Sequence, residues 1–196
     1  MSSISLDQIK ELRERTQASF ADCKVVLEET GGDIEEAVKR LRVRGADIAE
    51  KREGHEANAG VIDAYIHSNG KIGVLVDLRT ETDFVAKTEE FKALAHDVAL
   101  HIAAANPRYL KPEDIPEEVR EEEKRLIAQQ FADSGKPPEI VGKIVEGKLQ
   151  SMAKDICLLP QPFVKDPDKT VQNVIDEAVA KFGEKIEIAH FARLEI

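Results

Sequence analysis

The segment from residue 60 to residue 80 limits the possible folds most, because its pattern fits a β-hairpin and little else. It reads GVIDAYIH, then SNGK, then IGVLVDLRT. Asn69-Gly70 is a dipeptide that type I′ turns prefer, since both central positions of that turn need positive φ. Alternation predicts one nearly apolar face, made of Ile62, Ala64, Ile66, Ile72, Val74, Val76 and Leu78.

The last twelve residues, KIEIAHFARLEI, alternate in the same way and predict a third antiparallel strand beside the hairpin. The three strands are expected near 60–67, 71–80 and 186–195. On the second face of this sheet, Tyr65, Leu75 and Phe191 would form an apolar patch. A half-apolar outer face on a small sheet is more often a contact surface than an accident, so we expect this patch to meet a partner.

The first 45 residues predict a compact module of three short helices, with apolar residues at spacings of three and four. Gly31-Gly32 ends the second helix, and Asp33 with Glu36 resembles a capping box that begins the third. The third helix is expected to end near Gly45. Residues 46–58 are charged and poor in core residues, so they are predicted to be a linker, with a partly helical form as an alternative, to a core domain formed by residues 59–196.

Between the strands, the core domain is predicted to be helical. Helical spacing indicates one helix through Phe91 and Ile102, and another that Thr170 caps and Gly183 ends. Residues 113–156 predict two antiparallel helices, separated by Gly135 and Pro137-Pro138. Their apolar stripes are narrow, which suits a protruding helical hairpin. The predicted fold class is therefore α+β.

Charge and apolar runs restrict the partners. The formal net charge of −10 argues against direct nucleic-acid binding, which needs clustered Lys and Arg, and it favours a protein partner. No apolar run approaches the roughly 18 residues of a membrane span. The first residues lack the basic and apolar regions of a signal peptide, so a cytoplasmic location is expected. Cys23 and Cys157 are expected to be reduced and at least partly buried, with an intermolecular disulfide as the alternative.

Groups that could perform catalysis are few. Residues 68–71, SNGK, lack the upstream glycine and the following Ser or Thr of a phosphate loop, so they are predicted to form only a turn. His96 and His101 lie five residues apart, off one helical face, and give neither a zinc site nor a nucleophile–base pair. We therefore expect no enzyme activity, no metal site and no cofactor.

The stretch TETDFVAKTEEF, residues 80–91, leaves two interpretations open. Thr82 or Asp83 could cap a helix there. Phe84 lies one heptad before Phe91 and could share its buried stripe, which the residues alone favour. Alternatively, residues 88–90 (Thr-Glu-Glu) offer a second helix start, and a bend there would leave Asp83 and Phe84 at an exposed tip.

Five stretches of the chain resemble the elongation factor Ts family, the guanine-nucleotide exchange factors for elongation factor Tu. They are LRERTQASFADCKVVLEETGGDIEEAVKRLRVRG, TDFVAKTEEF, AHDVALHIAAANPRYL, GKPPEIVGKIVEGKL and QPFVKDPDKTV. The resemblance covers nearly the whole chain. It implies a ubiquitin-associated-type fold for the first 45 residues and a coiled-coil projection for residues 113–156.

The resemblance also implies which residues contact the GTPase. It places Thr82, Asp83, Phe84 and Val85 in the segment that enters the GTPase near its magnesium site and dislodges Mg²⁺. It implies that the three-helix module of the first 45 residues, here called the head module, contacts the nucleotide domain of elongation factor Tu through Thr16, Ala18, Ser19 and Phe20. Gln17 stands where relatives commonly have Gly, and Phe20 where many have Met, so the contacts of this loop are expected to differ in detail.

The implied function is exchange. The chain would bind elongation factor Tu in its GDP-bound and nucleotide-free forms and promote GDP release, so that GTP can rebind. Longer relatives carry two similar core halves, whereas this chain shows one set of three strands. We therefore expect a homodimer that associates through its sheets. Composition alone would also suit a helical adaptor or an acidic, chaperone-like scaffold.

Overall fold

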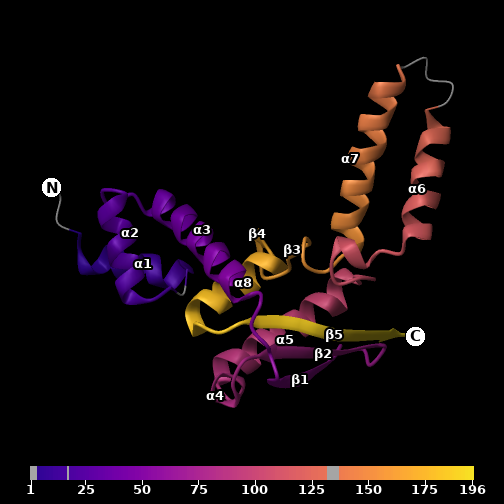
Figure 1. Ribbon diagram of the computed structural model, residues 1–196. Coiled ribbons are helices and arrows are strands. Elements are labelled where there is room, and N and C mark those ends of the chain that lie inside the picture. Colours follow the sequence, from indigo (N-terminus) through magenta and orange to yellow (C-terminus); the bar gives the residue numbers. More distant parts are fainter. Residues whose placement is uncertain (1–3, 17, 132–136) are drawn as a thin grey trace.

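The computed structural model describes residues 4–16, 18–131 and 137–196. It confirms an α+β fold. Figure 1 shows a helical head module at one end, a three-stranded sheet with its covering helices in the middle, and two projecting helices at the other end.

The head module consists of α1 (Leu6–Thr16), α2 (Phe20–Glu29) and the first half of α3 (Ile34–Arg52). Asp33 caps α3 as predicted, because its carboxylate accepts a hydrogen bond from the backbone N–H of Glu36 at 3.0 Å. The module has its own hydrophobic core, separate from that of the sheet. This core consists of Ile9, Leu12, Cys23, Val26, Leu27, Ala37, Val38 and Leu41.

The prediction that the third helix ends near Gly45 is wrong. Helix α3 continues to Arg52, so the first part of the predicted linker is helical. Its second half packs on α8 (Val171–Phe182), and a Cβ atom at Gly45 would lie 3.6 Å from the carbonyl oxygen of Asp176. The glycine therefore serves close helix packing rather than termination, and tertiary contacts outweigh its low helix propensity.

The sheet contains β1 (Ala59–Ile66), β2 (Ile72–Thr80) and β5 (Ile186–Glu195) in the order β1-β2-β5, all antiparallel. The third strand was predicted from the tail and is confirmed. The turn is wider than the predicted two-residue form: Gly70 donates its N–H to the carbonyl of His67 at 2.8 Å, and of the two residues Asn69 and Gly70 only Gly70 has positive φ (68°).

The prediction of one apolar face shared by all seven hairpin residues is also wrong. Tyr65 pairs with Val74 and Ala64 pairs with Leu75, so even-numbered residues of β1 share a face with odd-numbered residues of β2. Cross-strand partners point to the same side of a sheet. Val74, Val76 and Leu78 are consequently buried, whereas Ile62 and Ile66 lie on the opposite, exposed face.

The expected patch of Tyr65, Leu75 and Phe191 does not exist as one surface. Tyr65 and Phe191 point inward and pack against the main core, and only Leu75 lies on the outer face. A β-bulge opposite Asp77 and Leu78 shifts the alternation of β5, which turns Phe191 inward. The apolar residues of the outer face, here called the outer sheet patch, are Ile62, Ala64, Ile66, Leu75, Ala192 and Leu194.

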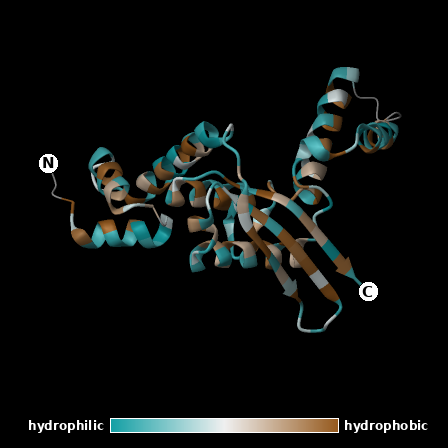
Figure 2. Ribbon diagram, turned by 60° about the horizontal axis from the view of Figure 1, so that its bottom comes forward, coloured by the Kyte–Doolittle hydropathy of each residue, from teal (hydrophilic) through white to brown (hydrophobic). Residues whose placement is uncertain are grey.

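Helices α5 (Glu89–Ala105) and α8 cover the inner face of the sheet, and apolar residues of both helices and all three strands form the main core. Helix α8 begins at the Thr170 cap and ends at Gly183 (φ 70°), as predicted. Two short strands, β3 (Pro162–Phe163) and β4 (Asp166–Thr170), pair with each other beside α8. Figure 2 shows hydrophobic residues along the strands of the three-stranded sheet.

The projecting pair consists of α6 (Glu117–Gln130) and α7 (Pro138–Ile156), which pack against each other and point away from the core (Figure 1). A 3₁₀ turn, η1 (Pro112–Asp114), precedes α6. Only Ile127 in α6 and Val145 in α7 are buried, in keeping with narrow apolar stripes. Gly135, the predicted break, lies outside the described residues. Among the helices described, none is long and apolar enough to cross a membrane.

Candidate functional site

The segment after β2 forms a single helical turn, α4 (Asp83–Ala86), which ends before α5 begins. Thr82 caps this turn, with its hydroxyl accepting from the N–H of Val85 at 3.5 Å. Thr88 caps α5 in the same way, accepting from the N–H of Phe91 at 3.2 Å. The chain therefore bends at Thr88, so the second of the two interpretations of this stretch is confirmed.

The bend separates Phe84 from the buried stripe of α5. Its side chain is 88% exposed, whereas Ala86 is 3% exposed and Phe91 is fully buried. The alternative in which Phe84 packs into the chain's own core is therefore wrong. Asp83 is exposed as well, with its carboxylate 3.5 Å from Lys87 Nζ. Figure 1 places α4 at the lower end of the core, away from the projecting helices.

Glu184, which follows α8, holds the base of this tip. Its two carboxylate oxygens accept three hydrogen bonds: from the hydroxyl of Thr80 at 2.8 Å, from the N–H of Thr82 at 3.0 Å and from the hydroxyl of Thr82 at 2.6 Å. Hydrogen bonds to an ionised carboxylate are stronger than neutral ones. The exposed ring is thus carried by a turn whose base is fixed to a distant part of the core.

Glu81, between the two threonines, makes a second set of contacts. Its carboxylate accepts from the N–H of Lys185 at 2.7 Å, contacts Arg52 Nη1 at 3.1 Å and lies 3.1 Å from His55 Nδ1. The backbone hydrogen bond from Lys185 is the main cause that lowers the pKa of Glu81, and the contacts with His55 and Arg52 lower it further. Glu81 therefore connects the tip to the end of α3 and the start of β5.

Glu184→Ala is expected to lower the free energy of unfolding by about 2–3 kcal/mol, because three donors lose a charged acceptor at a partly buried site. Urea unfolding followed by circular dichroism measures this change. Glu146→Ala, at an exposed position of α7, serves as the control and is expected to change stability little. Equal, small effects of both substitutions would show that Glu184 does not hold the tip.

Glu81→Gln is expected to reduce the pH dependence of stability in acid. The pKa of Glu81 is lowered in the folded chain, so its contribution is present above the usual value of 4.5 and is lost as the pH falls through the lowered folded value. The unfolding free energies of parent and variant should therefore differ most near neutral pH and converge in acid. Urea unfolding from neutral pH to about pH 3 tests this. A constant difference over that range would contradict it, and exposed Glu118→Gln is the control.

Comparison with known proteins shows the family of this chain. The family model described as elongation factor TS matches residues 5–196. The chain is 50% identical to the elongation factor Ts of Carboxydothermus hydrogenoformans over 193 residues, which cover 98% of this chain and 89% of the relative. It is 49% identical to that of Desulforamulus reducens over 196 residues, covering 100% and 90%. The chain belongs to the elongation factor Ts family. Its place is therefore in translation elongation.

The expected contact residues of the head module differ in exposure. Thr16 is buried, and its hydroxyl donates to the carbonyl of Leu12 at 2.7 Å, so it stabilises α1. Ser19 caps α2 by accepting from the N–H of Asp22 at 3.1 Å. Ala18 is partly buried, and Phe20 is 46% exposed. Gln17 lies outside the described residues. Phe20 is thus the expected contact that presents a large apolar surface.

His101 and the two cysteines are buried and pack within the fold. His101 is buried, with Nε2 3.0 Å from Gln161 Oε1 and Nδ1 accepting from the N–H of Val164 at 3.2 Å; burial lowers its pKa. Cys23 and Cys157 are buried free thiols whose pKa values are raised by burial. Among the described residues, no three His, Cys, Asp or Glu side chains cluster so as to hold a metal ion.

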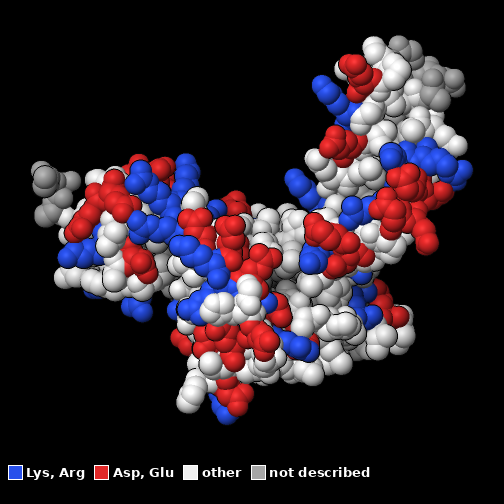
Figure 3. Space-filling view, viewed as in Figure 1, with Lys and Arg blue, Asp and Glu red and all other residues white. Residues whose placement is uncertain are grey.

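Sequence reasoning did not identify Glu81 and Glu184 as supports of the tip. Glu184 is 104 residues from Thr80, and nothing in its local pattern distinguishes it from the other acidic residues that follow helices. On the face shown in Figure 3, acidic and basic side chains are interspersed, and acidic ones gather over the middle of the molecule. This distribution agrees with the negative net charge and gives that face no extended basic surface.

Proposed function

We propose that this chain is the guanine-nucleotide exchange factor of elongation factor Tu and acts in the cytoplasm. It binds the GDP form, displaces Mg²⁺ and promotes GDP release, so that GTP can rebind. The observation that carries the proposal is the 88% exposed ring of Phe84 on a turn whose base is fixed by Glu184. Exposing a large aromatic side chain on a well-anchored turn gains nothing for folding, but it suits insertion into a partner.

The ring acts as a wedge near the metal site. Mg²⁺ bridges phosphate oxygens and protein ligands, so displacing it leaves the charge of the nucleotide uncompensated and speeds release. Asp83 is proposed to orient the turn and to accept hydrogen bonds from the partner's backbone. Its exposed carboxylate, paired only loosely with Lys87 at 3.5 Å, is free to do so.

The wedge needs support from a broader interface. Burial of a phenylalanine side chain contributes roughly 1.5–3 kcal/mol, which is at most about two decades of affinity. The remaining binding free energy is proposed to come from the head module, through Phe20 and its neighbours, and from other surfaces of the core. The coupling is reciprocal, since GDP weakens the binding of this protein as much as this protein weakens the binding of GDP.

Release of fluorescent GDP from purified elongation factor Tu, with and without this protein, tests the proposed function. Substoichiometric amounts should accelerate release many-fold, because an exchange factor turns over. A helical adaptor would bind elongation factor Tu without changing the rate of release. A chaperone-like scaffold would bind many proteins weakly instead. Either result would contradict the proposal.

We further propose that two copies associate through the outer sheet patch. Ile62 is 73% and Leu194 is 78% exposed, and Leu75 lies between Ala64 and Ala192 at the centre of the patch. A contiguous apolar surface of this kind is typical of an interface. A two-fold axis through Leu75 would make the patch self-complementary, as homodimer contacts usually are.

A further inference from the structure

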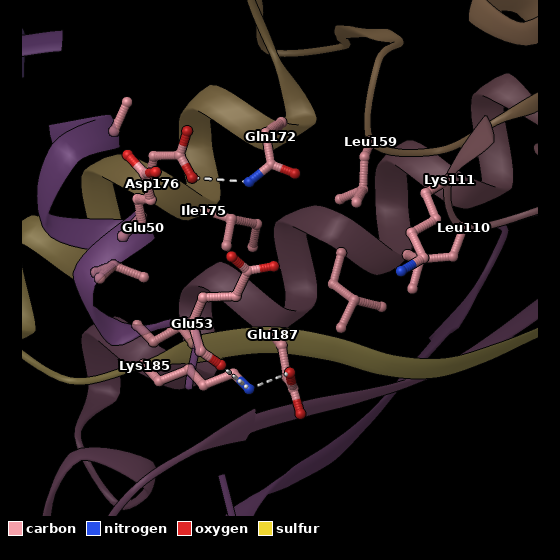
Figure 4. Close-up of a pocket in the computed structure, with 15 residues that line it drawn as sticks. Glu50, Glu53, Leu110, Lys111, Leu159, Gln172, Ile175, Asp176, Lys185 and Glu187 are labelled. Atoms are coloured by element: carbon pink, nitrogen blue, oxygen red, sulfur yellow. Dashed lines mark hydrogen bonds and ion pairs between the residues drawn. The ribbon is translucent and has the colours of Figure 1, made fainter. Parts of the chain in front are cut away.

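A cleft of about 420 Å³ lies where α3, α8, the start of β5 and the base of the projecting helices meet (Figure 4). Its floor is apolar and is formed by Ala49, Leu110, Leu159, Ile175, Val179 and Ile188. A cleft of this size is within the range that binds ligands. None of its lining residues belongs to α4, α1 or α2, the elements that carry the named contact residues of the proposed exchange function.

The rim of the cleft is acidic. Four carboxylates and two ammonium groups line it, and Lys185 is already occupied, with its Nζ 3.0 Å from Glu187 and 3.0 Å from the carbonyl of Glu53. Within the described part of the chain, the carboxylates of Glu50, Glu53 and Asp176 have no ion-pair partner. Asp176 accepts only an amide hydrogen bond, from Gln172 at 2.7 Å. The cleft is therefore complementary to a cation.

The two ends of the cleft carry opposite charges. In Figure 4, Lys111 lies at the opposite end from Glu50 and Asp176. A second cavity, of about 400 Å³, shares Lys111, Leu159 and Gln172 with the first and continues past Pro160 and Thr170. The two cavities therefore adjoin, and together they are here called the junction groove. Two adjoining cavities with many apolar lining residues suit a chain molecule better than a compact ligand.

One side of the junction groove is the edge of the sheet. Residues 185–188 all line it, although successive residues of a strand point to opposite faces. The groove therefore meets the edge of β5 at its start, over residues 186–188, and β5 pairs only with β2 among the described strands. An open strand edge beside side-chain pockets is the arrangement by which proteins bind extended peptides.

We propose that the junction groove binds an extended peptide segment of a partner protein, with a Lys or Arg side chain among Glu50, Glu53 and Asp176. The aliphatic part of that side chain would lie on Ala49 and Ile175, while its charged end reaches the three carboxylates. Main-chain groups of the segment would follow the edge of β5. This binding site is separate from the Phe84 tip and does not depend on nucleotide exchange.

The test uses a short blocked peptide that alternates valine with serine and has one central lysine. Its binding to the full ¹⁵N-labelled chain is followed by NMR, and shifts are expected at residues that line the groove, such as Ala49, Ile175 and Ile188. Glu50→Gln/Glu53→Gln/Asp176→Asn is expected to weaken binding by about tenfold, because three charge pairs at the surface each contribute a factor of about two. Glu121→Gln/Glu122→Gln/Glu123→Gln on α6 removes the same charge elsewhere and should bind like the parent.

Matched ligands separate the alternatives. A peptide with norleucine in place of lysine should bind the parent about as weakly as the lysine peptide binds the groove variant. Butylammonium, which has the charged end but no main chain, should bind much more weakly than the lysine peptide. The proposal is overturned if butylammonium binds as tightly as the peptide, if the α6 variant loses as much affinity as the groove variant, or if the peptide causes no shifts at the groove.

Discussion

Phe84→Ala is expected to slow the GDP release that this protein stimulates by about ten- to a hundredfold, since the ring contributes roughly 1.5–3 kcal/mol when it is buried in a partner. The fold should be unchanged, because the side chain is 88% exposed and Ala86 and Val85 anchor the turn in the core. Stopped-flow measurement of fluorescent GDP release gives the rate, and circular dichroism checks the fold.

Two further variants make this result specific. Phe84→Leu keeps an apolar side chain at the tip and should retain an intermediate rate. Ile140→Ala removes a 44% exposed apolar side chain from α7, far from the tip in sequence and structure, and should release GDP like the parent. An unchanged rate in Phe84→Ala would remove the wedge from the mechanism, while the family membership of the chain would stand.

Leu75→Glu is expected to convert the proposed homodimer into a monomer. Leu75 is the central residue of the outer sheet patch, opposite Ala64 on β1 and Ala192 on β5. A two-fold interface would bury the new carboxylate twice without a counter-charge. The dissociation constant should rise by about a hundredfold or more, since burying an unpaired charge costs several kcal/mol. Sedimentation at micromolar concentration measures the change.

The matched control is Leu126→Glu, which places the same charge on a 42% exposed position of α6. It should sediment like the parent. A parent chain that is already monomeric at micromolar concentration would remove the dimer from consideration. A Leu75→Glu variant that remains dimeric would place the interface on another surface.

The strands and most helix ends could be predicted because they depend on neighbouring residues. The cap at Thr170 and the left-handed Gly183 bound α8 in the structure as they do in the sequence. The predicted assignment of side chains to the two faces of the sheet was wrong where it depends on how neighbouring strands pair. The register across the hairpin places Tyr65 opposite Val74, and a β-bulge in β5 turns Phe191 inward. Neither feature follows from the alternation of residues within one strand.

The candidate site was predictable in its residues but not in its support. Both threonine caps, Thr82 and Thr88, can be recognised in the sequence. Whether Phe84 joins the buried stripe of Phe91 or lies on a separate helical turn depends on the packing of the whole core. The resemblance to the family favours an exposed position for Asp83 and Phe84, and the structure agrees. Glu184 could not be identified, because its contacts with Thr80 and Thr82 join segments about a hundred residues apart.

Helix α3 belongs to the small hydrophobic core of the head in its first half and lies on α8 in its second, where Gly45 packs against α8. Reorienting the head would require bending a continuous helix or lifting it off α8. The separation between Phe20 and Phe84 is therefore fixed by the fold before a partner binds. In the proposed complex, a GTPase whose two contact points match this separation would lose little conformational entropy on docking, and one with a different separation would fit poorly.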